Sequence, residues 1–175
     1  MEFNNTRYLD EMSRLLADGA AALRTAHPDA VVYTVSIWTD PNAAQSAVSF
    51  DTAEHSAAAI AQSDVWSAKH RERLIAAGRH IEAELYRPRT GERCQNPADF
   101  AYRNIASITH TAFPRGWAGA TEGRCWEVLG PALLRVQREA LREYAALPRH
   151  AQAVIAINSD ADWYDVPLPF PRTAS

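Results

Sequence analysis

The chain has 175 residues, of which 47% are hydrophobic and 22% charged. This composition excludes wholesale disorder and predicts one globular domain of ordinary size, spanning residues 1–175. The formal net charge of −3 argues against a dedicated nucleic-acid or anionic-membrane binder, whose surface would carry a basic excess. Residues 1–5 resemble no secretory signal, and no stretch reaches the roughly 18 apolar residues of a membrane span. We therefore expect a cytoplasmic protein.

The first half of the chain predicts a helix, a β-hairpin and a second helix. Apolar residues recur at helical spacing over residues 5–26, and Gly19 lies on that apolar stripe, where it can mark a close approach by another element. Residues 31–38 and 46–51 have the β-branched and aromatic character of strands, joined by turn residues. Thr52 is a suitable N-cap for a helix that runs to about residue 62.

The second half predicts more helices and one further strand. The apolar spacing favours helices over residues 63–86, 96–112 and from Pro131 to Pro148, and an ordered loop over residues 114–130. Residues 151–157 are strongly apolar and predict a central strand, followed by a proline-rich strap or tail over residues 166–175. The expected fold class is α+β, with a small antiparallel or mixed sheet of about three to four strands covered by several amphipathic helices.

Acidic and aromatic residues gather where two of the predicted strands end. One group follows the apolar strand at 151–157, and the other lies at the tip of the hairpin. If these two strands run parallel, both groups meet at one edge of the sheet. Aromatic anchors flanked by charges are typical of a protein-binding patch, although Trp38 could instead pack beneath a helix and the carboxylates could form a solvated loop. The candidate partner-binding residues are Trp38, Asp40, Asp160, Asp162, Trp163 and Asp165.

No common catalytic motif occurs in the sequence. It contains no G-x-S-x-G, Walker, G-x-G-x-x-G or H-E-x-x-H pattern, and its six histidines lack the spacing of a metal site. These observations favour a binding protein over an enzyme, with no catalytic residue, metal or cofactor assigned. The alternative is a small metal-assisted hydrolase or transferase that uses the cluster Asp160, Asp162 and Asp165 with His55 or His110.

Four short stretches together resemble a family of uncharacterised bacterial domains. The shared pattern is a strand that ends in aromatic-x-Asp, an N/D-T-x-E helix start, a proline-small-acid-aromatic helix start and a last strand that ends in an acid. These stretches are residues 32–40, 50–54, 96–102 and 154–160. The resemblance is to the domain-of-unknown-function family numbered 4303, and more loosely to SUKH-like immunity proteins of bacterial polymorphic-toxin systems.

The resemblance implies a cytoplasmic protein that binds another protein, such as a cognate toxin domain, and supplies no catalytic residue. Together with the residue patterns it leads to the expectation of a non-catalytic, immunity-type binding domain. A homodimer whose exposed tryptophans cover each other is a further alternative.

Overall fold

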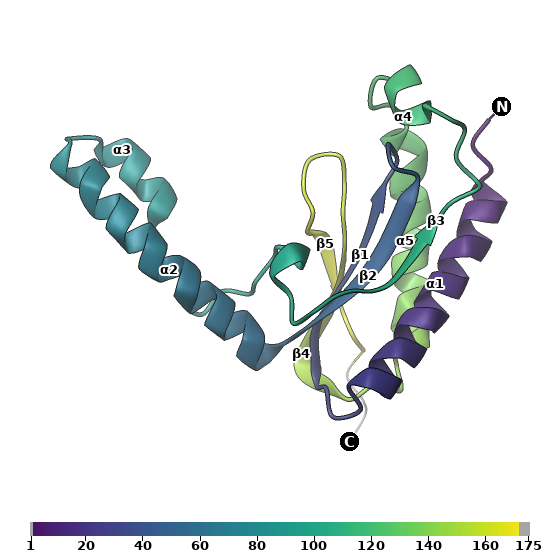
Figure 1. Cartoon of the computed structure of the whole chain (residues 1–175), viewed down its shortest axis with the longest axis horizontal. Helices are drawn as coiled ribbons and strands as arrows, with labels where there is room; N and C mark the ends of the chain where they lie inside the picture. The colour runs from purple at the N-terminus through teal and green to yellow at the C-terminus, as the bar shows by residue number, and fades with distance from the viewer. Residues whose placement is uncertain (1, 172–175) are drawn as a thin grey trace.

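A five-stranded mixed sheet forms the centre of the molecule (Figure 1), and the computed structural model describes residues 2–171. The strand order is β3-β2-β1-β4-β5; β1 and β4 are parallel, and the other neighbouring pairs are antiparallel. The α+β class is therefore confirmed, with five strands where about three to four were expected. The strands are β1 (Val32–Asp40), β2 (Gln45–Thr52), β3 (Tyr102–Thr109), β4 (Arg149–Ile157) and β5 (Asp165–Pro169).

Two long helices, α1 (Asn5–Ala26) and α5 (Trp126–Glu143), cover one face of the sheet and enclose the main core (Figure 1). The helix α1 matches its predicted range, and its N-terminus is capped by the Asn4 side chain, which accepts a hydrogen bond from the Arg7 amide. The close approach predicted at Gly19 is confirmed, because a Cβ atom there would lie 3.3 Å from the Tyr144 hydroxyl.

The opposite face of the sheet is polar and is only partly covered. Alternation along β1 and β2 places four fully buried polar side chains on this face, beneath the segment that leads from residue 87 to residue 101. They are Thr34, Ser36, Ser49 and Asp51. Arg93 holds this segment in place, because its guanidinium donates hydrogen bonds to the carbonyl oxygens of Tyr33 and Gln152 and to the Thr34 hydroxyl.

A helical arm projects from this polar face (Figure 1). Helix α2 (Ala53–Ala76) contacts the sheet only near its start and then runs outward, where it packs with α3 (His80–Ala83) and the 3-10 turn η1 (Glu84–Tyr86). We call residues 63–89 the arm. Asp64 joins the two ends of the arm, because its carboxylate accepts hydrogen bonds from the Arg89 amide and the Thr90 hydroxyl.

The prediction of a helix over residues 96–112 is wrong. A short 3-10 turn, η2 (Pro97–Asp99), is followed by strand β3, which pairs with β2. The pairing register shifts between Val48 and Phe50, and Asn104 has a φ of 45° at this irregularity. Extra residues in a strand interrupt its period-two alternation. Ile105 and Ile108 consequently lie three positions apart, a spacing that is typical of a helix although both residues belong to strand β3.

Other boundaries also differ from the predictions. The break expected near residue 62 is absent, because α2 continues to Ala76, and the loop expected over residues 114–130 contains α4 (Trp117–Ala120) and the start of α5. Pro131 lies inside α5. Part of the predicted proline-rich strap forms β5, which pairs with β4, whereas residues 172–175 lie outside the described residues.

Within residues 2–171, no helix combines the length and the apolar character needed to cross a membrane.

Candidate partner-binding groove

Two tryptophans that are far apart in the sequence meet at one edge of the sheet. Because β1 and β4 are parallel, the end of β1 lies beside the loop that follows β4. The rings of Trp38 and Trp163 pack edge to face, with centroids 6.1 Å apart and an interplanar angle of 87°. Below them, the Asn158 side chain accepts a hydrogen bond from the Thr39 amide and donates one to the Thr39 carbonyl oxygen, both at 2.9 Å. The ends of the two strands are thereby locked together.

The tryptophans line an open groove of about 510 Å³, which we call the tryptophan groove. One wall comes from η2 and the start of β3, and the other from the end of β1 and the loop after β4. Its lining residues are Trp38, Asp40, Asn96, Pro97, Ala98, Arg103, Asn104 and Trp163. Trp163 is 55% exposed and Trp38 is half-buried, so both rings are accessible to a partner.

Asn104 fixes the orientation of Trp38. The irregularity in β3 directs the Asn104 side chain toward the groove, where its Oδ1 atom accepts a hydrogen bond from the indole N–H of Trp38 at 3.2 Å. Ser49 donates a weaker bond to the same oxygen and accepts one from the Asn104 amide at 2.9 Å. A ring held in this way loses little rotamer freedom on binding, which favours its use as an anchor.

Asn104 was not among the predicted site residues. The available signal was an asparagine within a run of strand-like residues, because Asn tolerates the left-handed backbone conformation better than other non-glycine residues. The apparent helical spacing of residues 96–112 concealed this signal.

The predicted carboxylates occupy three different places around the groove. Asp40 lines it, and its Oδ1 atom also caps the hairpin turn by accepting hydrogen bonds from the amides of Asn42 and Ala43. Asp160 and Asp162 are exposed on the loop that carries Trp163, and Asp165 is half-buried at the start of β5. None of these four carboxylates belongs to an ion pair with another side chain of residues 2–171. This edge of the sheet is therefore locally acidic, with Arg103 as the basic side chain in the groove lining.

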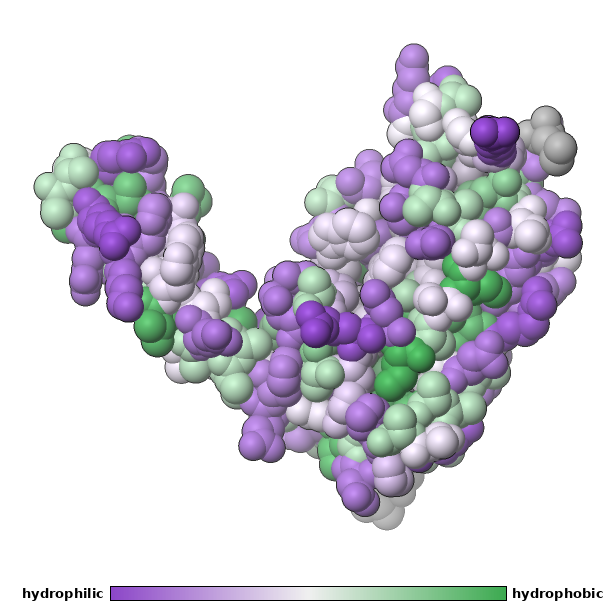
Figure 2. Space-filling model, in the orientation of Figure 1, coloured by the Kyte–Doolittle hydropathy of each residue, from purple (hydrophilic) through white to green (hydrophobic). Residues whose placement is uncertain are grey.

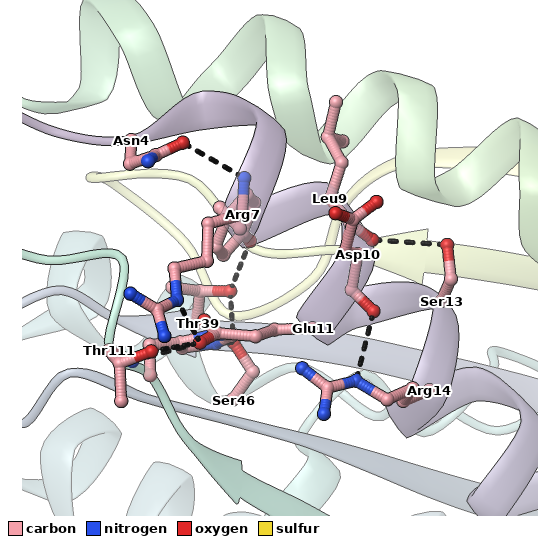
Figure 3. A network of polar contacts seen from close by, with 12 residues as sticks. Asn4, Arg7, Leu9, Asp10, Glu11, Ser13, Arg14, Thr39, Ser46 and Thr111 are labelled. Atoms are coloured by element: carbon pink, nitrogen blue, oxygen red, sulfur yellow. Dashed lines mark hydrogen bonds and ion pairs between the residues drawn. The ribbon is translucent and has the colours of Figure 1, made fainter.

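A buried network of hydrogen bonds lies on the helix-covered face of the sheet (Figure 3). The carboxylate of Glu11 accepts hydrogen bonds from the Nδ1 atom of His110 at 2.9 Å and from both the amide and the hydroxyl of Thr111. The Nε2 atom of His110 contacts the Ser46 hydroxyl at 2.7 Å. From Ser46 the chain of bonds continues through the Thr39 hydroxyl, at 2.6 Å, to that of Tyr8, at 2.8 Å. We call this set of side chains the glutamate–histidine network.

The electrostatics of this network fix the direction of its bonds. Burial disfavours the charged form of Glu11, but the hydrogen bonds from Thr111 and His110 outweigh burial and hold the pKa of Glu11 below its usual value. Burial also lowers the pKa of His110, against the opposing effect of Glu11. An ionised Glu11 therefore faces a neutral His110, whose Nδ1–H donates to Glu11 and whose Nε2 accepts from Ser46.

This Ser-His-Glu arrangement has the connectivity of a catalytic triad, but its side chains are buried. Ser46 is fully buried and His110 is 5% exposed. None of the hollows described in the structure is lined by Ser46, His110 or Glu11. The network consequently holds α1 to the ends of β1, β2 and β3, with the Ser46 hydroxyl and the His110 ring buried.

A second histidine–carboxylate pair lies on the polar face. The Nδ1 atom of His55 contacts the Oδ1 atom of Asp51 at 2.8 Å, and the same oxygen accepts a hydrogen bond from the Ala101 amide. The other oxygen of Asp51 is buried and has no hydrogen-bond partner among the described residues. Burial raises the pKa of Asp51, against the opposing contributions of Ala101 and His55. The His55 side chain is 42% exposed and lines a hollow of about 700 Å³ at the base of the arm.

Neither histidine pairs with the carboxylates of the predicted hydrolase site. The ring nitrogens of His110 are taken by Ser46 and Glu11, and His55 pairs with Asp51. Among residues 2–171, no group of three or more histidine, cysteine, aspartate or glutamate side chains is arranged to hold a metal ion.

Comparison with known proteins gives no relative. No family model matches the chain, and neither the curated proteins nor the solved structures provide a match. The resemblance to family 4303 therefore remains an expectation from the sequence.

Proposed function

We propose that the chain is a protein-binding domain that takes a basic segment of its partner in the tryptophan groove. The observation that carries this proposal is the meeting of Trp38 and Trp163 over a groove surrounded by carboxylates that have no ion-pair partner among residues 2–171. Binding energy at protein interfaces is concentrated in a few aromatic anchors, and unpaired charges at the rim steer the approach of an oppositely charged partner.

The sequence resemblance suggests what kind of partner this is. An immunity-type protein binds a toxin domain and blocks it, and a toxin domain with a basic surface would be attracted to Asp160 and Asp162. We therefore propose an immunity function, with the tryptophan groove as the contact surface. The hydrolase alternative lacks comparable support, because His55 and His110 are held by other carboxylates.

The direct test is whether the chain neutralises the product of the gene next to its own in its genome of origin, which an immunity function requires to encode a toxin domain. We expect the wild-type chain to restore growth of cells that express that domain, and to bind the purified domain in calorimetry. Trp163→Ala should weaken binding at least tenfold and abolish protection, and so should the combined Asp160→Lys and Asp162→Lys variant.

The matched control is Val128→Ala on α5, which removes an exposed apolar side chain far from the groove in the sequence. It should bind and protect like the wild type. Absence of protection by the wild-type chain would overturn the immunity function. Unchanged binding by the Trp163→Ala variant would show that the groove is not the contact surface.

A further inference from the structure

The arm carries a concentration of exposed apolar side chains. Nine large hydrophobic residues among those described are exposed, and five of them lie within residues 63–89. Ile81 is 89% exposed and Leu85 is 81% exposed, values close to those of an unfolded chain. The other three are Val65, Trp66 and Ile75. Clusters of this kind on a soluble domain mark interaction surfaces.

The arm is nevertheless a defined structure and not a loose extension. Leu74 and Ala83 are buried between its helices, and the rings of Trp66, His70 and Tyr86 form a small stacked cluster. An ion pair between Arg71 and Glu84 joins α2 to η1. The arm can therefore present its exposed side chains in a fixed arrangement, which reduces the entropy cost of docking.

The charge of the arm is opposite to that of the rest of the chain. Residues 63–89 contain six lysines and arginines and four aspartates and glutamates, a balance of +2. Because the whole chain has a balance of −3, the remainder has a balance of −5. Lys69 and Arg73 on the arm have no ion-pair partner among the described residues, and neither do Asp160 and Asp162 beside the tryptophan groove.

The hollow at the base of the arm lies next to the tryptophan groove. The hollow at the base of the arm and the tryptophan groove share two lining residues, Ala98 and Arg103, so they are neighbouring parts of one concave surface. Figure 2 shows the arm and the body as two lobes separated by a hollow, with hydrophobic atoms exposed on the arm. The lobes of a second copy could interlock with this shape.

We propose that two copies of this chain form a dimer by exchanging arms. The arm of each copy lies in the concave surface of the other, where Ile81 and Leu85 pack near Trp38 and Trp163 and the cations Lys69 and Arg73 face Asp160 and Asp162. A two-fold axis makes the contact twice and closes the assembly. Each contact then needs to bury only about 400 Å² per copy to reach the roughly 800 Å² that a stable interface requires.

The first test is the mass of the intact chain in solution, measured by light scattering across a concentration series. We expect the wild-type chain to have twice the mass of the 19.4 kDa monomer and to dissociate as salt is raised. The Ile81→Asp and Leu85→Asp double variant should be monomeric at every concentration, and its circular dichroism should be unchanged because both side chains are exposed. Val128→Asp, an equally polar change outside the arm, should remain dimeric.

A charge exchange identifies the surface that receives the arm. The Lys69→Glu and Arg73→Glu variant and the Asp160→Lys and Asp162→Lys variant should each be monomeric, whereas their equimolar mixture should form a heterodimer. A monomeric wild-type chain would overturn arm exchange. Dimerisation of the Asp160→Lys and Asp162→Lys variant alone would also overturn it, because the arm would then dock elsewhere. The arm of a second copy and the basic segment of a partner would occupy the same groove, so dimerisation competes with partner binding. The Lys69→Glu and Arg73→Glu variant leaves the groove itself unchanged. Its binding of the toxin domain therefore tests the proposed function independently of the dimer.

Discussion

The two faces of the sheet each hold a histidine–carboxylate pair, and the two pairs differ in how completely they are satisfied. On the helix-covered face, both oxygens of Glu11 accept hydrogen bonds, and both ring nitrogens of His110 have partners. On the polar face, one oxygen of Asp51 has no partner, and the ring of His55 is partly open to solvent. The same chemical pair therefore serves different purposes in the two places.

The difference separates the part of the molecule that is built for stability from the part that is available for contact. A fully paired and buried polar network specifies one arrangement of α1 against the strand ends, because every alternative leaves a buried polar group without a partner. The polar face keeps unpaired groups, the tryptophan groove and the projecting arm. Substitutions in the glutamate–histidine network should consequently be costly, and those in the less completely bonded pair of Asp51 and His55 should be inexpensive.

The largest expected contrast comes from the same acid-to-amide change at the two carboxylates. Glu11→Gln replaces an oxygen that accepts a hydrogen bond with an amide that donates one, so it should lower the free energy of unfolding by about 2–3 kcal/mol. Asp51→Asn can keep its bonds to His55 and Ala101 and place the amide where the unpartnered oxygen was. Its effect should be within about 0.5 kcal/mol. Urea denaturation measures the free energy of unfolding of both variants. Equal losses of stability in the two variants would contradict the contrast.

The next effect is the dependence of stability on pH. Below about pH 6.5 an unfolded histidine binds a proton. Burial lowers the pKa of folded His110, so the folded chain does not bind that proton. Stability should therefore fall as the pH drops from about 6.5 toward the folded pKa of His110, with a slope of up to about 1.4 kcal/mol per pH unit. The pKa of Glu11 is also lowered, so protonation of Glu11 removes further stability at lower pH. The pKa of Asp51 is raised, so this group contributes a gain in stability as the pH falls.

The His110→Gln variant should flatten this slope below about pH 6.5. His80→Gln, which changes an exposed histidine on the arm, is the control and should retain it. Thermal or urea denaturation at a series of pH values measures the slope, and a slope that survives in His110→Gln would assign it to another group.

The smallest effect distinguishes two fully buried tyrosines. The Tyr8 hydroxyl is hydrogen-bonded to Thr39, whereas the Tyr144 hydroxyl is buried and has no hydrogen-bond partner within residues 2–171. Tyr8→Phe should therefore destabilise the protein by about 1 kcal/mol, and Tyr144→Phe should leave it unchanged or raise its stability by up to about 1 kcal/mol. The urea denaturation midpoints of the two variants measure both changes in stability. A loss in Tyr144→Phe as large as that in Tyr8→Phe would show that the second hydroxyl is satisfied as well.

The sequence was informative wherever local periodicity and tertiary packing agreed. The helix α1 has an apolar stripe that faces the core, so its range could be predicted, and the hairpin of β1 and β2 follows from β-branched residues around a turn. The condition that β1 and β4 run parallel, on which the meeting of the acidic strand ends depends, is met. Their use in binding a partner stays a prediction.

The features that the sequence did not reveal depend on contacts between distant residues. Strand β3 was mistaken for a helix because the irregularity at Asn104 breaks its alternation, and that error hid the side chain that positions Trp38. The pairing of His110 with Glu11 joins residues that are 99 positions apart. No local pattern identifies such a partner, because it is selected by how the helix and the strand ends pack together.

The parallel pairing of β1 with β4 also has a consequence for the kinetics of folding. The contact between Thr39 and Asn158 joins residues 119 positions apart, whereas β1 and β2 are joined by a short turn. Local pairings form faster than contacts that require long loops to close. We therefore expect the hairpin of β1 and β2 to form early and β4 to join it late. The two tryptophans come together only at that last step, so a nascent chain would have no groove until the loop that carries Trp163 has been synthesised.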